Sequence, residues 1–505
     1  MTNKNCGIIL SYVNTFLLMA SGLFLSSFLL NSFGDTDYGI YQIMSSFANY
    51  LVLLEFGTGT VISRNVVAAR TRGESQLQIE KNISTIWTVT ASLAVVIVVV
   101  SLIFYAIIPF IYSKSLTAEQ VVLGRQIFIT IIVFLVSSFV SQTLNGIALA
   151  FERYTFASTM SITKTTVRTL SLIVLVWVTK HVIVIAIVDA VIGVLIAVYS
   201  YFYCMKKFHV RIGFGNFDRK ILRASLPLCL AIFLQTIVNQ SNNTVGKFVL
   251  GIALGPEEVA LYSVALYVFG IFSSLSTIPV SMYAPQVTKH VISGLEGLDL
   301  TKTLVQPCRL MVLVSGSVLF GFIACGKQFI DIVYGHEYAL AWIMAVILIG
   351  AAFLNMSNAV VINVLDVKNK RHIRSLLLMF TTALNIVMTI VGVKHFGIVA
   401  VATATGLSMI LQVIMLNCYY QMAINIKVIY LFIHIFKGIL PFQILGATVG
   451  YIIGSRITNE YFAFFASGIA YLVVAFGLFL IFGKNESEAI GIANLKEKIM
   501  SRVRG

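Results

Sequence analysis

Charged residues are scarce in this sequence, and acidic residues are the scarcest of them. Only 11% of its 505 residues are charged, with 20 Asp and Glu against 35 Lys and Arg. Soluble globular domains carry about a quarter of their residues as charged side chains. Hydrophobic residues make up 58% of the chain, and the mean hydropathy is +0.94. The composition therefore excludes a soluble globular protein and predicts an all-α protein that crosses the membrane many times.

Residue patterns that carry enzymatic or metal chemistry are also missing. The six cysteines are scattered without a C-x-x-C spacing, which indicates neither a zinc site nor a disulfide framework. The sequence has no dense cluster of His or carboxylates, no glycine-rich phosphate loop and no intervening segment large enough for a catalytic domain. We therefore predict that the protein is not an enzyme and holds no cofactor or metal.

Apolar runs dominate the chain, and each is long enough for a transmembrane helix, which needs about 20 residues. The first run lacks a small-residue cleavage pattern, so we interpret it as a retained span and not as a signal peptide. We count fourteen runs. They cover approximately residues 8–30, 39–63, 83–111, 121–151, 156–178, 183–205, 226–254, 259–282, 308–330, 341–365, 372–393, 398–420, 437–455 and 461–482.

Lys and Arg fall mainly on one side of the predicted membrane. If the N-terminus is placed inside, most of the basic residues outside the spans, including Arg309, lie on the inner side. This asymmetry follows the positive-inside rule and predicts that both termini are cytoplasmic. The net charge of +15 is then explained by orientation and by anionic lipid, so the predicted partners are membrane lipids and not nucleic acid.

Two short segments recur about half a chain apart. Residues 178–186 and 392–400 share a Lys-His pair before an apolar run, and residues 33–41 resemble residues 254–262. Two parallel six-helix repeats with two further helices explain this spacing, and substrate sites in such proteins lie between the repeats. The predicted parts are a lobe at 1–205, a linker at 206–223, a second lobe at 224–420, two added helices at 421–482 and an amphipathic tail at 483–505.

Polar side chains interrupt the seventh apolar run. A membrane helix has no water to satisfy such groups, so they are expected to face protein or a water-filled cavity. One interpretation is a substrate-binding wall, and the other is hydrogen bonding between neighbouring helices. For the lysine that follows, snorkelling to the outer surface is the alternative. The residues predicted to bind substrate here are Asn239, Gln240, Asn242, Asn243 and Lys247.

Charged residues well inside the spans form a second group. Lys164 and Arg168 are four residues apart, so they share one face of a helix near mid-depth. We predict that they bind an anionic part of the substrate, and the alternative is a structural ion pair with Glu55 or Asp189. These two carboxylates are candidates for ion coupling, since ionisable groups inside the membrane often mark ion pathways. Their alternative role is to hold neighbouring helices together.

Several short motifs carry a family resemblance. They are Tyr12-Val13-Asn14, Gly34 with Tyr38-Gly39-Ile40-Tyr41, Leu54-Glu55-Phe56-Gly57 followed by Arg64, and Tyr283-Ala284-Pro285-Gln286. With these motifs and its plan of fourteen spans, the chain resembles the polysaccharide transport family of Wzx-type flippases. That family belongs to the multidrug/oligosaccharidyl-lipid/polysaccharide exporter superfamily.

The resemblance implies a MATE-like fold of two lobes with a central cleft lined by the first, second, seventh and eighth helices. It implies a flippase that moves undecaprenyl-pyrophosphate-linked oligosaccharide repeat units across the bacterial cytoplasmic membrane by alternating access. The units would serve O-antigen or capsule assembly, beside other membrane proteins of the same pathway. Members often carry an Asp in the seventh helix, where this chain has Asn242 and Asn243. Coupling to a proton or sodium gradient at that position is therefore in doubt.

Two other functions stay open as alternatives. A cation-coupled small-molecule exporter of the MATE type shares the fold, but it would favour acidic residues in its cleft. In this chain the cations inside the spans outnumber the acids. A membrane enzyme of polysaccharide assembly, such as a polymerase, would handle the same lipid-linked sugars.

Overall fold

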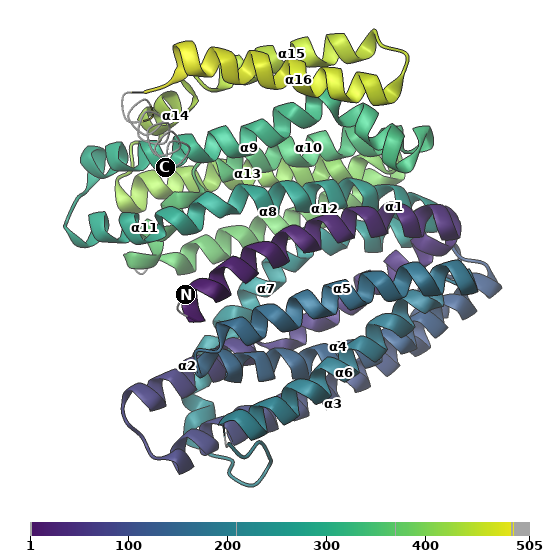
Figure 1. The fold of residues 1–505 in the computed structure, drawn as a ribbon, viewed down its shortest axis with the longest axis vertical. Helices are drawn as coiled ribbons and strands as arrows, with labels where there is room; N and C mark the ends of the chain where they lie inside the picture. The colour runs from purple at the N-terminus through teal and green to yellow at the C-terminus, as the bar shows by residue number, and fades with distance from the viewer. Residues whose placement is uncertain (1–2, 209, 369, 486–487, 489–505) are drawn as a thin grey trace, which may run out of the picture. The chain divides into compact units, whose positions relative to one another are not determined.

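The computed structural model describes residues 3–208, 210–368, 370–485 and 488, and its regular elements there are all helices (Figure 1). The first helices are α1 Asn3–Leu51, η1 Val52–Glu55, α2 Thr58–Thr71, α3 Gln76–Ile111, α4 Ala118–Ala150, α5 Tyr154–Thr179, α6 Ile183–Phe208, α7 Arg219–Ala253 and α8 Pro256–Ile292. The others are α9 Gly297–Tyr334, η2 His336–Tyr338, α10 Ala339–Met356, η3 Ala359–Val361, α11 Ile362–Val367, α12 Arg371–Phe396, α13 Val399–Ile424, α14 Val428–Phe436, α15 Leu440–Ser455, α16 Glu460–Leu478 and η4 Phe479–Gly483.

Eleven of the described helices are long and apolar enough to cross a membrane, or twelve if the bent pair α14 and α15 forms one span. The prediction of an all-α polytopic protein is confirmed, while the count of fourteen and the orientation remain predictions. The count treats α1 as one span. Its backbone leaves the helical conformation at Gly34 (φ 75°, ψ 172°), which lies between the two apolar runs, residues 8–30 and 39–63, that the sequence predicts as separate spans. Glycine adopts this positive φ without a Cβ clash. α7 is not among the counted spans.

One pair of sequence repeats meets in the structure. Gly39 of α1 comes so near the start of α8 that a Cβ on it would lie 2.0 Å from the carbonyl oxygen of Pro256. Beside this contact, the Thr36 hydroxyl donates a hydrogen bond of 3.2 Å to Glu257. Only glycine lets the two backbones approach this closely.

The chain forms two compact units, residues 1–263 and 264–505. In the first unit, α4, α5 and α6 lie side by side, α2 and α3 pack on α4, and α5 and α7 pack on α1 (Figure 1). The fully buried side chains of Ile62, Ile83, Leu144 and Ile147 join α2, α3 and α4 in one core. The division falls inside α8, and the predicted boundaries of the lobes and linker remain a prediction. The predicted tail helix, with Ile492, Leu495, Ile499 and Val503, lies outside the described residues.

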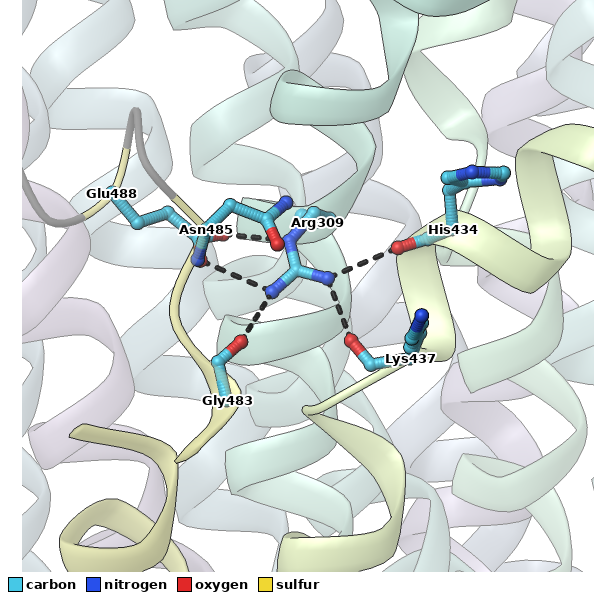
Figure 2. A network of polar contacts seen from close by, with 6 residues as sticks. All are labelled: Arg309, His434, Lys437, Gly483, Asn485 and Glu488. Atoms are coloured by element: carbon cyan, nitrogen blue, oxygen red, sulfur yellow. Dashed lines mark hydrogen bonds and ion pairs between the residues drawn. The ribbon is translucent and has the colours of Figure 1, made fainter. Parts of the chain in front are cut away.

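In the second unit, α9 packs against α10, α14, α15 and α16, and α13 packs against α10 and α12. Arg309 of α9, expected from the sequence on the inner side of the membrane, is only 1% exposed. Its guanidinium donates to the carbonyl oxygens of His434, Lys437 and Gly483 at 3.0, 2.7 and 2.9 Å. It also forms a two-point ion pair with Glu488, at 2.7 and 3.0 Å (Figure 2). Arg309 therefore joins the break between α14 and α15 to the segment after α16.

The Arg309 network leads to a stability prediction. Arg309→Met leaves Glu488 and three carbonyl oxygens without their donor, and removing one partner of a buried ion pair costs about 3–5 kcal/mol. We expect a clear fall in the melting temperature of the purified protein, measured by size exclusion after heating. Lys302→Met is the control on the same helix. The Lys302 side chain is 55% exposed and pairs only at the surface with Asp299, so no change is expected. Equal melting temperatures for Arg309→Met and the wild type would contradict the role of the network.

Candidate functional site

A cavity of about 570 Å³ lies inside the first unit, between α1, α4, α5 and α6. Four of the charged residues predicted for binding or coupling line it: Glu55, Lys164, Arg168 and Asp189. They come from η1, α5 and α6, so segments far apart in the sequence bring them together. A cluster of charges in a cavity is typical of substrate and ion pathways in membrane proteins.

Arg168 and Asp189 form an ion pair across α5 and α6. Arg168 Nε donates to Asp189 Oδ1, and Nη2 donates to Oδ2 at 3.0 Å. The Asp189 side chain is 11% exposed and that of Arg168 is 30% exposed. The structure thus has the ion pair that the alternative interpretation of Arg168 expected, with Asp189 and not Glu55 as its partner. The pair also faces the cavity, so structural and binding roles are compatible.

Lys164 lies one turn before Arg168 on the same helix and has no carboxylate partner in the described part of the chain. Its Nζ lies 4.9 Å from the centre of the Phe134 ring of α4. A cation over an aromatic face is stabilised by about 0.5–2 kcal/mol, which is less than the cost of burying an unpaired charge. Lys164 is therefore the cation of this cavity that an anionic ligand can neutralise.

Glu55 lies where the helical path breaks between η1 and α2. The next two residues, Phe56 and Gly57, have left-handed φ angles of 51° and 67°. Glu55 Oε2 accepts a hydrogen bond of 3.0 Å from Gln142 Nε2 of α4. Just after the break, the Thr58 and Thr143 hydroxyls are 3.0 Å apart and hold α2 against α4. Broken helices carry substrate and ion sites in many transporters.

Uncharged polar groups complete one wall of the cavity. Ser21, Ser45 and Asn49 of α1 and Ser138 and Gln142 of α4 line it. Ser138 Oγ is buried and has no hydrogen-bond partner among the described residues. Hydroxyl and amide groups bind sugar hydroxyls, and a buried hydroxyl without a partner is costly unless water or a ligand satisfies it. Sequence reasoning missed these residues because single polar residues in apolar runs usually serve helix packing.

The polar run of α7 does not line this cavity where it is described. Its backbone is helical, while the side chains of Asn239, Asn242 and Asn243 lie outside the described residues. Thr244 is buried and donates to the Gln240 carbonyl oxygen at 2.7 Å. Lys247 Nζ donates to Gln42 Oε1 of α1 at 2.9 Å. The substrate role of this run remains a prediction.

A polytopic helical fold with a charged and polar cavity inside one helical unit is typical of a membrane transporter. The chain belongs to the family described as Polysaccharide biosynthesis protein, which matches residues 7–291, more than half of its length. The family resemblance predicted from the sequence is confirmed.

Comparison with known proteins gives a relative and several similar folds. The relative is the probable low-salt glycan biosynthesis flippase Agl15 of Haloferax volcanii, 25% identical over 183 residues. That match spans 35% of this chain and 38% of the relative, so it covers well under half of either protein.

Solved structures show the fold over nearly the whole chain. The lipid II flippase MurJ in an inward closed conformation has a TM-score of 0.74 at 15% identity, covering 94% of this chain and 98% of that one. An inward-facing multidrug resistance MATE family transporter of the MOP superfamily has a TM-score of 0.60 at 13% identity, covering 83% and 95%. The predicted MATE-like fold is confirmed.

Proposed function

We propose that this protein is a flippase that moves lipid-linked oligosaccharides across a membrane. Family membership, a relative named as a glycan flippase and the MurJ-like fold support this proposal. The observation that carries it is the cavity in which Lys164, a cation without a carboxylate partner among the described residues, lies beside a wall of hydroxyl and amide groups. A lipid-linked sugar needs a cation for its phosphates, polar groups for its glycan and a path that leaves its tail in lipid.

The finer proposal concerns the carrier and the membrane. An undecaprenyl pyrophosphate carrier in the bacterial cytoplasmic membrane fits the family, with O-antigen or capsule as the polymer. In this proposal Lys164 and Arg168 bind the pyrophosphate, while Asn49, Ser138 and Gln142 contact the first sugars. Alternating access then exposes the cavity to one side of the membrane at a time.

Reconstitution tests the proposed function directly. Purified protein in vesicles should expose a lipid-linked oligosaccharide, first confined to the inner leaflet, to an external lectin. Vesicles without protein are the control. If the saccharide becomes polymerised or its phosphate linkage is cleaved, the protein is an enzyme of polysaccharide assembly. If the saccharide stays intact and enclosed at the rate of the control, the flippase proposal is wrong.

A cation-coupled exporter of small molecules is the second candidate, and the MATE neighbour together with Glu55 in the cavity favours it. Such a protein would carry organic cations and would not need Lys164. Efflux of a cationic dye from the same vesicles, without transfer of the oligosaccharide, would support this candidate over the flippase.

Ion coupling by Glu55 is a separate prediction. Glu55→Gln removes the carboxylate at the break between η1 and α2 and preserves the size of the side chain. We expect a proton gradient, but not a sodium gradient, to accelerate translocation by the wild type, and the Glu55→Gln rate to stay at the gradient-free level. Glu119→Gln removes an exposed carboxylate at the start of α4, outside the cavity, and is expected to keep the response. A full response of Glu55→Gln to the gradient would remove Glu55 from coupling.

A further inference from the structure

A second cavity, of about 380 Å³, lies in the first unit where α2 ends and α3 and α7 begin. It shares no lining residue with the larger cavity. Its volume falls within the range of about 300–1,000 Å³ that is common for small-ligand sites. The basic residues of this end of the unit place it at the predicted cytoplasmic side of the membrane. We therefore expect its walls and charges to lie at the headgroup region of the bilayer.

Hydrogen bonds fix the polar wall of this cavity. Asn65 Nδ2 of α2 donates to Ser225 Oγ of α7 at 2.8 Å, and Ser225 is 4% exposed. Asn82 of α3 is 8% exposed and donates to the Gln78 carbonyl oxygen at 3.0 Å. The first bond joins α2 to α7, the second fixes the Asn82 side chain within α3, and α3 packs against both α2 and α7. Packing among these three helices therefore forms the cavity without a ligand.

Two arginines give the cavity its charge. Arg64 of α2 and Arg72 at its end are eight residues apart, which is about two helical turns, and both line the cavity. The Arg72 guanidinium lies 3.7 Å from the Glu74 carboxylate. Arg64 has no ion pair or hydrogen bond in the described part of the chain. With one carboxylate against two guanidinium groups, the cavity carries a net positive charge.

A neighbouring arginine of the same helix behaves differently. Arg70 Nη1 donates to the Ala150 carbonyl oxygen at 2.6 Å, and its guanidinium lies 4.7 Å from the centre of the Phe151 ring. Arg70 is thus occupied in packing α2 against α4. Arg64 makes no such contact among the described residues, although it lies on the wall of a formed cavity.

We infer that this cavity binds a phosphate or pyrophosphate group of a lipid headgroup. A guanidinium matches phosphate oxygens in a two-point geometry, and amide groups beside it supply further donors. Basic pockets on the cytoplasmic side of membrane proteins bind anionic headgroups in this way. An anionic phospholipid and a pyrophosphate-linked lipid present the same chemistry here. The site does not depend on what the larger cavity transports.

Binding of inorganic pyrophosphate to the full-length protein in neutral detergent tests this site at low ionic strength. We expect Arg64→Gln to weaken binding on the order of tenfold, since a charge-assisted hydrogen bond contributes more than a neutral one. Arg64 and Arg223 are both exposed, but only Arg64 lines the cavity. Arg223→Gln therefore makes the same charge change on α7 outside the cavity, and it should leave the affinity within about twofold of the wild type. Equal losses in both variants would mean binding by adventitious surface charge, and no binding by the wild type would mean that the cavity is not a phosphate site. Either result would overturn the inference.

Two further arms separate the sources of the phosphate and the two cavities. Native mass spectrometry from phosphatidylglycerol nanodiscs should show a retained phospholipid that Arg64→Gln loses. Displacement of this lipid by pyrophosphate indicates one site for both ligands, and its persistence indicates a phospholipid site. Since Lys164 is proposed to bind pyrophosphate in the larger cavity, Lys164→Gln is expected to remove binding there and to leave the binding that Arg64→Gln weakens. If Lys164→Gln abolishes binding and Arg64→Gln does not, the pyrophosphate binds in the larger cavity and the inference is wrong, whatever the transport assay shows.

Discussion

Lys164→Gln is expected to reduce translocation of the lipid-linked oligosaccharide by about ten- to a hundredfold, because a hydrogen bond to a charged group contributes about 1.5–3 kcal/mol. Lys164 faces the cavity and has no carboxylate partner in the described part of the chain, so the substrate anion is its natural partner. The measurement is the rate at which the glycan becomes accessible to an external lectin in vesicles with matched protein amounts.

Matched variants separate the charge of Lys164 from its position. Lys164→Arg keeps a cation on the same turn of α5 and is expected to restore most of the rate. Lys180→Gln removes an exposed lysine at the end of the same helix, outside the cavity, and should behave like the wild type. Undiminished transport by Lys164→Gln would exclude this side chain from substrate binding.

Composition and the positions of charges predicted much of this architecture. A chain with few charges and long apolar runs can only satisfy its backbone in a membrane as helices or a closed barrel. The charges that interrupt the runs are costly inside a membrane, so they predicted residues that need a polar or paired environment. Lys164, Arg168, Glu55 and Asp189 are such residues, and the structure brings them to one cavity. Their roles in substrate binding and coupling remain predictions.

Pairing within this group was beyond sequence reasoning. Lys164 and Arg168 share a helix face, and both had Glu55 and Asp189 as candidate partners. Only the packing of α5 against α6 brings Arg168 to Asp189, and only the break after η1 turns Glu55 towards Gln142. Such choices depend on helix rotation and kinks. When a span is apolar on nearly all sides, its hydrophobic periodicity does not show which side faces the neighbouring helices.

Buried Arg309 illustrates a second limit of sequence reasoning. It lies at the start of an apolar run and was expected with the other inner-side cations, since a lone arginine near a helix end usually reaches water. The structure satisfies it internally with three carbonyl oxygens and Glu488 (Figure 2). These partners lie more than a hundred residues away in the sequence. Nothing local distinguishes Arg309 from a solvated arginine.

Asp189→Asn is expected to destabilise the protein by about 3 kcal/mol, the lower end of the cost of breaking a buried ion pair. The lower end applies because the Arg168 side chain is partly exposed to the cavity. The variant keeps the size of the side chain. The loss of stability therefore comes from the unpaired guanidinium of Arg168 and not from an empty space in the packing. The measurement is the melting temperature of the purified protein. Arg168→Gln leaves the Asp189 carboxylate without its partner instead, and its melting temperature should fall by a similar amount.

The double variant Arg168→Gln/Asp189→Asn separates stability from transport. Removing both charges leaves no uncompensated ion, so the melting temperature should recover most of either single loss, as double-mutant cycles show for paired residues. If the pair only holds α5 to α6, the double variant transports like the wild type. Arg168 faces the cavity one turn from Lys164. We therefore expect the double variant to be stable but to transport about tenfold more slowly than the wild type, because one charged contact to the substrate is lost. A double variant no more stable than the single variants would contradict the ion pair, and full transport by a stable double variant would leave Lys164 as the anion-binding residue of the cavity.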